Sequence, residues 1–186
     1  MDKLQGKQQE TLLQQRMQGF LPKIDVAGDR YFIDLRLQEL RLVGVPDIVL
    51  PFHQMERDDL FGKYFFFYDK ATKSIYPEER LQNIPKDVVA IAMPYDRDLD
   101  PVGFAQKHNY SIEETLKEYP IKEGLKAAVL PVDEQFLQNP IAAGVTLLLI
   151  GIGAGPEEIT VSTNVLEKQK PMKKAAANKK QKGKHL

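Results

Sequence analysis

The chain has 186 residues, of which 42% are hydrophobic and 28% charged, enough for one globular domain with its own core. The absence of cysteine excludes disulfide bonds and thiolate metal sites. No apolar stretch follows the first residues, so we expect no signal peptide and a cytoplasmic protein.

The formal net charge of zero conceals two regions of opposite charge. Residues 168–186 contain eight lysines and no acid; removing these eight from the 26 basic residues leaves 18 against 26 acidic ones, a charge of −8. Residues 166–186 contain no aromatic side chain, and we expect them to form a disordered basic tail. The eight lysines predicted to attract polyanions are Lys168, Lys170, Lys173, Lys174, Lys179, Lys180, Lys182 and Lys184.

Lysines on a disordered tail attract phosphate polyanions such as nucleic acid without sequence specificity, and this attraction weakens in salt. The tail has no arginine and no aromatic side chain, so it offers neither bidentate base readout nor stacking. A tail that only keeps the protein in solution is the alternative.

Residues 1–18 are rich in glutamine and carry few large apolar side chains. The spacing of Leu12, Leu13 and Met17 predicts a short helix with a narrow apolar stripe. Such a helix is marginally stable alone and needs a surface to pack on. That surface is either the helix's own domain or a partner.

Residues 29–38 alternate between apolar and polar side chains, which predicts a strand with one buried face. The turn signal at 27–29 predicts a hairpin between this strand and residues 23–26. Asp34 and Arg36 share the wet face, where we expect a screened ion pair. After Leu37 the apolar side chains move from odd to mostly even positions of the alternation. This shift predicts a bend or bulge near Gln38.

Further strands are predicted at 47–52, 63–69, 74–76, 87–93 and 125–132. Residues 87–93 are continuously apolar, as in a strand buried on both faces. Between the last two of these strands, Asp100 is the N-cap of a predicted helix that begins at Pro101 and runs to about His108. Ser111 with Glu114 forms a capping box for a second helix, to about Tyr119.

The sequence therefore predicts an α+β fold with a single domain and a mostly antiparallel sheet, a short helical pair near 101–119, and a disordered basic C-terminal tail. The expected boundaries are a glutamine-rich N-terminal helix at 1–18, an α+β domain at 19–165, and a lysine-rich tail at 166–186.

Residues 135–156 carry no charge, and residues 141–154 form the most apolar segment of the chain. Fourteen residues cover about 21 Å as a helix, short of the roughly 30 Å of hydrocarbon in a bilayer. We therefore prefer a buried strand here, with membrane association as the alternative.

Two motif-like patterns are incomplete, so we expect no cofactor and no metal site. The glycines at 151, 153 and 155 place the third glycine one position early for a dinucleotide fingerprint. The acids at 96, 98 and 100 begin like an EF-hand loop, but Pro101 and Lys107 stand where that loop needs glycine and glutamate.

Three functions remain open, and we favour a non-enzymatic interaction or accessory module. It would bind an unidentified protein partner through exposed aromatic side chains at Tyr64, Phe66 and Tyr68, while the tail attracts polyanions. We assign no catalytic residue.

The second possibility is a small hydrolase or metal-dependent enzyme that uses His53 and the nearby acids Glu56, Asp58 and Asp59. It requires that His53 converge with Asp96 or Asp98 in a cleft. The third is a protein attached to a membrane through residues 141–154, with the tail on anionic lipid.

Overall fold

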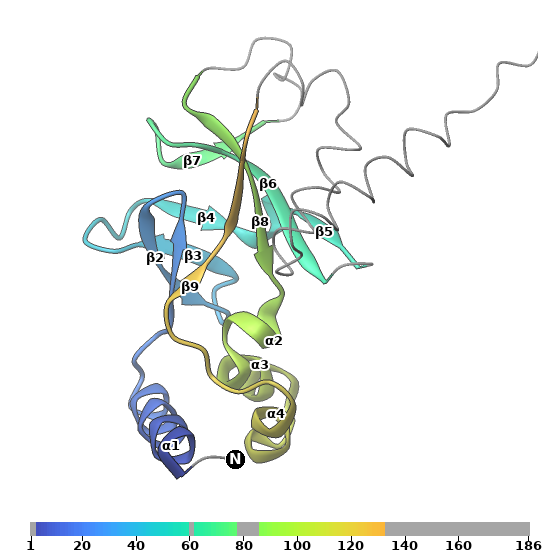
Figure 1. The fold of residues 1–186 in the computed structure, drawn as a ribbon. Coiled ribbons are helices and arrows are strands. Elements are labelled where there is room, and N and C mark those ends of the chain that lie inside the picture. Colours follow the sequence, from blue (N-terminus) through green and yellow to red (C-terminus); the bar gives the residue numbers. More distant parts are fainter. Residues whose placement is uncertain (1–2, 60–61, 78–85, 133–186) are drawn as a thin grey trace, which may run out of the picture.

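The computed structural model describes residues 3–59, 62–77 and 86–132. Their backbone forms two sheets, with the α-helices gathered at one end of the strands (Figure 1). The helices are α1 (Lys3–Met17), the 3₁₀ turn η1 (Phe52–Gln54), α2 (Asp96–Leu99), α3 (Pro101–His108) and α4 (Ile112–Glu118).

The first sheet has the strand order β4-β3-β2-β1-β9. All of its pairs are antiparallel except β1 with β9, which is parallel. Its strands are β1 (Lys23–Val26), β2 (Asp29–Asp34), β3 (Glu39–Leu42), β4 (Val49–Pro51) and β9 (Leu125–Lys126).

The second sheet has the strand order β10-β8-β6-β5, and β7 also pairs with β6. Every pair in it is antiparallel, so the mixed, mostly antiparallel architecture expected for this chain is confirmed. Its strands are β5 (Glu56–Asp58), β6 (Lys63–Asp69), β7 (Ser74–Tyr76), β8 (Val88–Pro94) and β10 (Ala128–Pro131).

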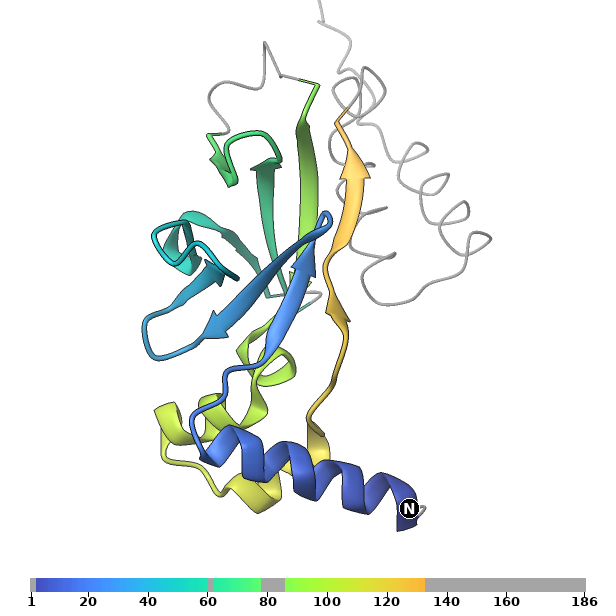
Figure 2. The same cartoon turned by 90° about the vertical axis from the view of Figure 1, so that its left-hand side faces the viewer.

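A single stretch of chain belongs to both sheets. β9 pairs with β1, and after Ala127 alone the chain continues as β10, which pairs with β8. The amide of Ala127 donates to the carbonyl of Asp25 at 2.8 Å, so the stretch stays bonded to β1 as it changes sheets. Figure 2 shows this stretch running past the end of β1. The two sheets are thereby held together at one edge.

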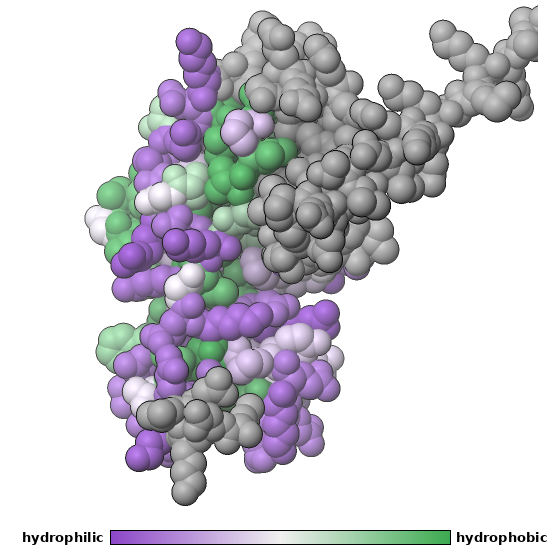
Figure 3. Space-filling view, viewed as in Figure 1, coloured by the Kyte–Doolittle hydropathy of each residue, from purple (hydrophilic) through white to green (hydrophobic). Residues whose placement is uncertain are grey.

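The main core lies between the inner faces of the two sheets. It contains the side chains that strand alternation turns inward, for example Ile24 and Val26 from β1 and Ile91 and Met93 from β8, all of them at most 1% exposed. In Figure 3, the surface around the helices is dominated by hydrophilic residues, whereas hydrophobic residues gather over the strands.

The structure confirms several local predictions. The predicted hairpin of β1 and β2 forms, and β8 is buried along Val88–Met93. The Asp100 carboxylate caps α3 through the amide of Gly103 at 2.9 Å, and Ser111 caps α4 through the amide of Glu114 at 3.3 Å.

The prediction that the second strand continues to residue 38 is wrong. β2 ends at Asp34, whose Oδ1 accepts the amides of Arg36 and Leu37 at 3.1 Å each and turns the chain. Gln38 then has φ 57°, which completes the reversal into β3. The shift in parity is therefore a hairpin turn rather than a bulge. Asp34 pairs with Arg41 across this hairpin at 2.6 Å, and not with Arg36.

Two buried tyrosines connect the sheets inside the core. Tyr31 of β2 and Tyr68 of β6 are both 0% exposed, and their hydroxyls lie 2.8 Å apart. The Tyr68 hydroxyl donates to Oδ2 of Asp29 at 2.8 Å, and Lys73 also reaches this oxygen. Burial is the main cause that raises the pKa of both Tyr31 and Tyr68. The neighbouring Tyr31 and Asp29 raise the pKa of Tyr68 further.

The lysine tail and the apolar segment 141–154 lie outside the described residues. Among the helices that are described, none is long and apolar enough to span a membrane.

The raised pKa of Tyr68 predicts a loss of stability in alkali. Above about pH 10 the unfolded chain releases its tyrosine protons before the folded chain does. The free energy of unfolding should then fall by up to about 1.4 kcal/mol per pH unit for each such tyrosine. Tyr68→Phe removes one of these protons, so urea titrations of this variant at increasing pH should show a shallower decline.

Tyr110→Phe is the matched control, because the side chain of Tyr110 is 59% exposed. It should leave the decline as steep as in the unaltered chain. If the free energy of unfolding of Tyr68→Phe fell as steeply with pH as that of the unaltered chain, the loss of stability in alkali would not come from Tyr68.

Candidate functional site

The described residues enclose a groove of about 930 Å³ between α1 and the first sheet. One wall comes from the end of α1 and the segment after it, Leu12–Pro22. The floor comes from β1, β2 and β9, and the far wall from residues 99–101 and 121–124. The position of α1 therefore determines whether the groove exists.

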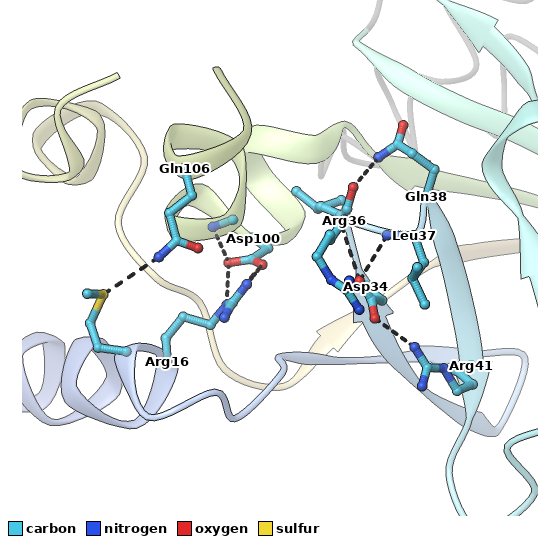
Figure 4. Close-up of polar contacts among 11 residues, drawn as sticks. Arg16, Asp34, Arg36, Leu37, Gln38, Arg41, Asp100 and Gln106 are labelled. Atoms are coloured by element: carbon cyan, nitrogen blue, oxygen red, sulfur yellow. Dashed lines mark hydrogen bonds and ion pairs between the residues drawn. The ribbon is translucent and has the colours of Figure 1, made fainter. Parts of the chain in front are cut away.

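A buried ion pair fixes α1 against the start of α3. Arg16 in the last turn of α1 donates from Nε to both carboxylate oxygens of Asp100, at 3.1 and 3.0 Å, and from Nη2 to Oδ2 at 2.9 Å. The Asp100 side chain is only 2% exposed. Figure 4 shows the guanidinium and the carboxylate facing each other across the two helices. A paired, chelating geometry of this kind keeps the buried carboxylate satisfied.

Gly103 leaves room for this ion pair. A Cβ atom at this position would press against Oδ2 of Asp100, 2.8 Å from its Cγ and 3.0 Å from Nη2 of Arg16. Because the carboxylate already accepts bonds from Arg16 and from the Gly103 amide, it cannot move aside cheaply. Glycine at the third position of α3 is thus a packing requirement.

Glutamine side chains of α1 bind the far wall of the groove. The Gln9 amide forms two hydrogen bonds with the backbone of Ile121, donating to its carbonyl at 2.8 Å and accepting from its amide at 2.9 Å. Gln8 donates to Glu123 at 2.9 Å. The glutamine-rich helix therefore packs on its own chain, the first of the two placements that the sequence left open.

The floor of the groove carries a surplus of positive charge. Register places Asp25 between Arg30 on β2 and Lys126 on β9, and all three side chains face outward with Lys23. The Asp25 carboxylate already accepts a hydrogen bond, because the amide of Gly28 donates to its Oδ1 at 2.8 Å. Lys23, Arg30 and Lys126 form no ion pair with any described residue, so three cations face one acid that is already bonded.

Apolar side chains lie beside these charges. The Phe32 ring is half-buried in the floor, and the Lys23 ammonium lies 5.0 Å from its centroid. Phe20 lines the groove and is 64% exposed, next to the half-buried Leu21 and Pro22. The groove thus combines cations with apolar surface.

The aromatic residues expected to form a partner surface are in the core. Tyr64 is 7% exposed, Phe66 3% and Tyr68 0%. The prediction that they form an exposed patch is therefore wrong. The reason is the position of β6, which lies between β8 and the pair β5 and β7 and turns these three side chains toward the first sheet. The sequence predicted a strand here correctly, but its aromatic side chains were wrongly expected at the surface.

The acid–base cluster expected around His53 is not assembled. His53 is exposed in η1, and no hydrogen bond or ion pair joins it to another described residue. Asp96 instead accepts the Tyr64 hydroxyl at 2.6 Å, and Asp98 pairs with Lys122 at 2.9 Å. Within the described ranges, no group of three histidines or acids is placed to hold a metal ion.

The eight lysines expected to bind polyanions lie outside the described residues. The groove cations, by contrast, were missed by sequence reasoning. A signal for two of them is present, because Lys23 and Arg30 alternate with the buried residues of the first hairpin. Lys126 joins them only through the pairing of β9 with β1, a contact about a hundred residues away in sequence.

Comparison of the chain with protein-family models, curated proteins and solved structures finds no match in any of the three.

The crowding around Gly103 predicts opposite effects for two glycine substitutions in helices. Gly103→Ala should lower the free energy of unfolding by about 1–3 kcal/mol, because its Cβ displaces the Asp100 carboxylate. Gly6→Ala in α1 has nothing within 4 Å of the added Cβ and should raise it by about 0.5–1 kcal/mol.

Chemical denaturation of the two full-length variants measures both effects. Stabilisation by both substitutions would contradict this prediction. Helix propensity alone would then decide the effect of Gly103→Ala, and the ion pair would not need the space that glycine leaves.

Proposed function

We propose that the chain is a non-enzymatic binding module that holds an acidic segment of a protein partner in the groove beneath α1. The lysine-rich tail adds non-specific attraction for polyanions such as nucleic acid. The observation that carries the proposal is the surplus of cations on the groove floor, at Lys23, Arg30 and Lys126.

The chemistry of the groove favours a carboxylate-bearing partner. Three cations without an ion-pair partner among the described residues create a positive potential, which a groove with protein walls concentrates. Carboxylates entering the groove would replace water around these cations and form charge-assisted hydrogen bonds, of which Arg30 can make two in parallel.

The apolar side chains give such a segment a second means of attachment. Phe20, Leu21 and Phe32 offer contact surface between the charges. A segment with acidic and apolar side chains would satisfy both features. Electrostatic complementarity contributes association rate and specificity, and the buried apolar contacts contribute most of the affinity.

The tail acts at longer range in this proposal. Its eight lysines lie among 19 residues without an acid, and they would increase the encounter rate with any polyanion. Contacts of this kind release counterions and depend steeply on salt, which distinguishes them from binding in the groove.

Reversing two groove charges tests the proposal. Arg30→Glu with Lys126→Glu should weaken binding of a fluorescent glutamate-rich peptide by about tenfold or more, because two attractive contacts become repulsive. Fluorescence anisotropy of the full-length chain at low and moderate salt measures the change.

The matched control is Arg36→Glu with Lys86→Glu, which makes the same charge change at two exposed positions that do not line the groove. A full-length variant with all eight tail lysines replaced by glutamine separates the contribution of the tail, because it should lose salt-sensitive binding to mixed DNA while keeping the peptide. Equal losses for the two charge-reversed pairs would show that only net charge matters and would contradict a specific groove.

A further inference from the structure

The outer face of the second sheet has an apolar centre, and the charged residues Glu56, Lys63 and Asp69 share this face at its edges. Strand pairing places Phe65, Ala92 and Ala128 in one row across β6, β8 and β10. The next row of the same face contains Phe67, Ala90 and Leu130. The two phenylalanine rings lie 5.4 Å apart, edge to face. These side chains point away from the main core and form a separate cluster.

This outer cluster is buried, although no second layer covers it among the described residues. Phe67 is 4% exposed, Val88 2%, Ala90 0% and Ala92 1%. The described residues that pack against these four all come from the same sheet or follow it directly: Phe65, Tyr76, Ala128, Leu130 and Val132. One layer of strands does not cover its own outer face, and a stable sheet needs a further layer there.

The chain itself continues from the edge of this face. β10 ends at Pro131, and Val132 already packs on the outer cluster. Residues 135–156, which begin three positions later, contain no charged side chain. A segment tethered this closely has a high effective concentration at the face, which a separate molecule lacks.

The lengths also agree. β6 and β8 each have seven residues, which cover about 23 Å at roughly 3.3 Å per residue. The densely apolar part of the segment, residues 141–154, covers about 21 Å even in the compact rise of a helix. The same length falls short of the roughly 30 Å of hydrocarbon in a bilayer.

We propose that residues 135–156 dock on the outer face of the second sheet of their own molecule and supply its missing layer. The hydrophobic segment is then a structural cover rather than a membrane anchor or a contact between copies. This inference is independent of the groove beneath α1, which belongs to the other sheet.

The absence of cysteine makes a clean accessibility test possible. In the full-length chain, Ala92→Cys places a thiol in the outer cluster, and Val129→Cys places one at a position that is 38% exposed. Maleimide should label Ala92→Cys about 100-fold more slowly than Val129→Cys, because the thiol reacts only when the cover opens.

Adding Leu148→Asp and Ile150→Asp to each chain puts two charges on the proposed cover. Labelling of Ala92→Cys should then accelerate by at least about tenfold, while labelling of Val129→Cys stays the same. Rates at Ala92→Cys that do not change with the two aspartates would overturn the proposal.

A crosslinking measurement gives an independent answer should Ala92→Cys fail to fold. Leu130→Cys, at the half-buried edge of the cluster, would carry a benzophenone maleimide in the presence of phosphatidylcholine vesicles. Crosslinks to residues 135–156 of the same chain support the proposal. Crosslinks mainly to a second chain, or to lipid, overturn it.

Discussion

The ion pair between Arg16 and Asp100 connects parts of the chain that are 84 residues apart, and the groove depends on it. Asp100 uses one carboxylate to cap α3 through Gly103 and to hold the end of α1. With the side chain of Asp100 2% exposed, removing Arg16 would leave a buried carboxylate without its counter-ion, a cost of about 3–5 kcal/mol. The glutamine contacts to Ile121 and Glu123 then align the rest of α1 along the groove wall.

The groove floor depends on the passage of one stretch of chain through both sheets. Because β9 adds to the edge of β1, Lys126 lies beside Asp25 and opposite the wall formed by α1. Because β10 follows at once, the same stretch forms the edge of the apolar second sheet. The charged groove and the apolar outer cluster are therefore separate surfaces, joined through Ala127, and changes in one need not disturb the other.

Local chemistry made much of the fold predictable, as the caps at Asp100 and Ser111 and the apolar run of β8 show. Tertiary contacts decided the rest. The turn after Asp34 depends on a carboxylate that bonds to the backbone, which hydrophobic alternation does not report. Tyr64 and Tyr68 look like surface residues in an aromatic run, yet their hydroxyls have the hydrogen-bond partners that tyrosine side chains need in a core. The groove was not predictable, because Lys126 meets Arg30 only after β9 pairs with β1, and Arg16 is placed by its distant partner Asp100.

A double-mutant cycle on the Arg16–Asp100 pair tests the account most directly. Arg16→Met keeps the aliphatic stem, and Asp100→Asn keeps a side chain able to cap α3. Urea unfolding of the full-length chain and of the three variants gives the coupling free energy between the two positions. The account predicts a coupling of about 2 kcal/mol, so that the double variant is less destabilised than the sum of the two single variants by that amount. If the two single losses in the free energy of unfolding simply added in the double variant, the account would be contradicted. Other contacts would then hold α1, and the groove would not depend on this pair.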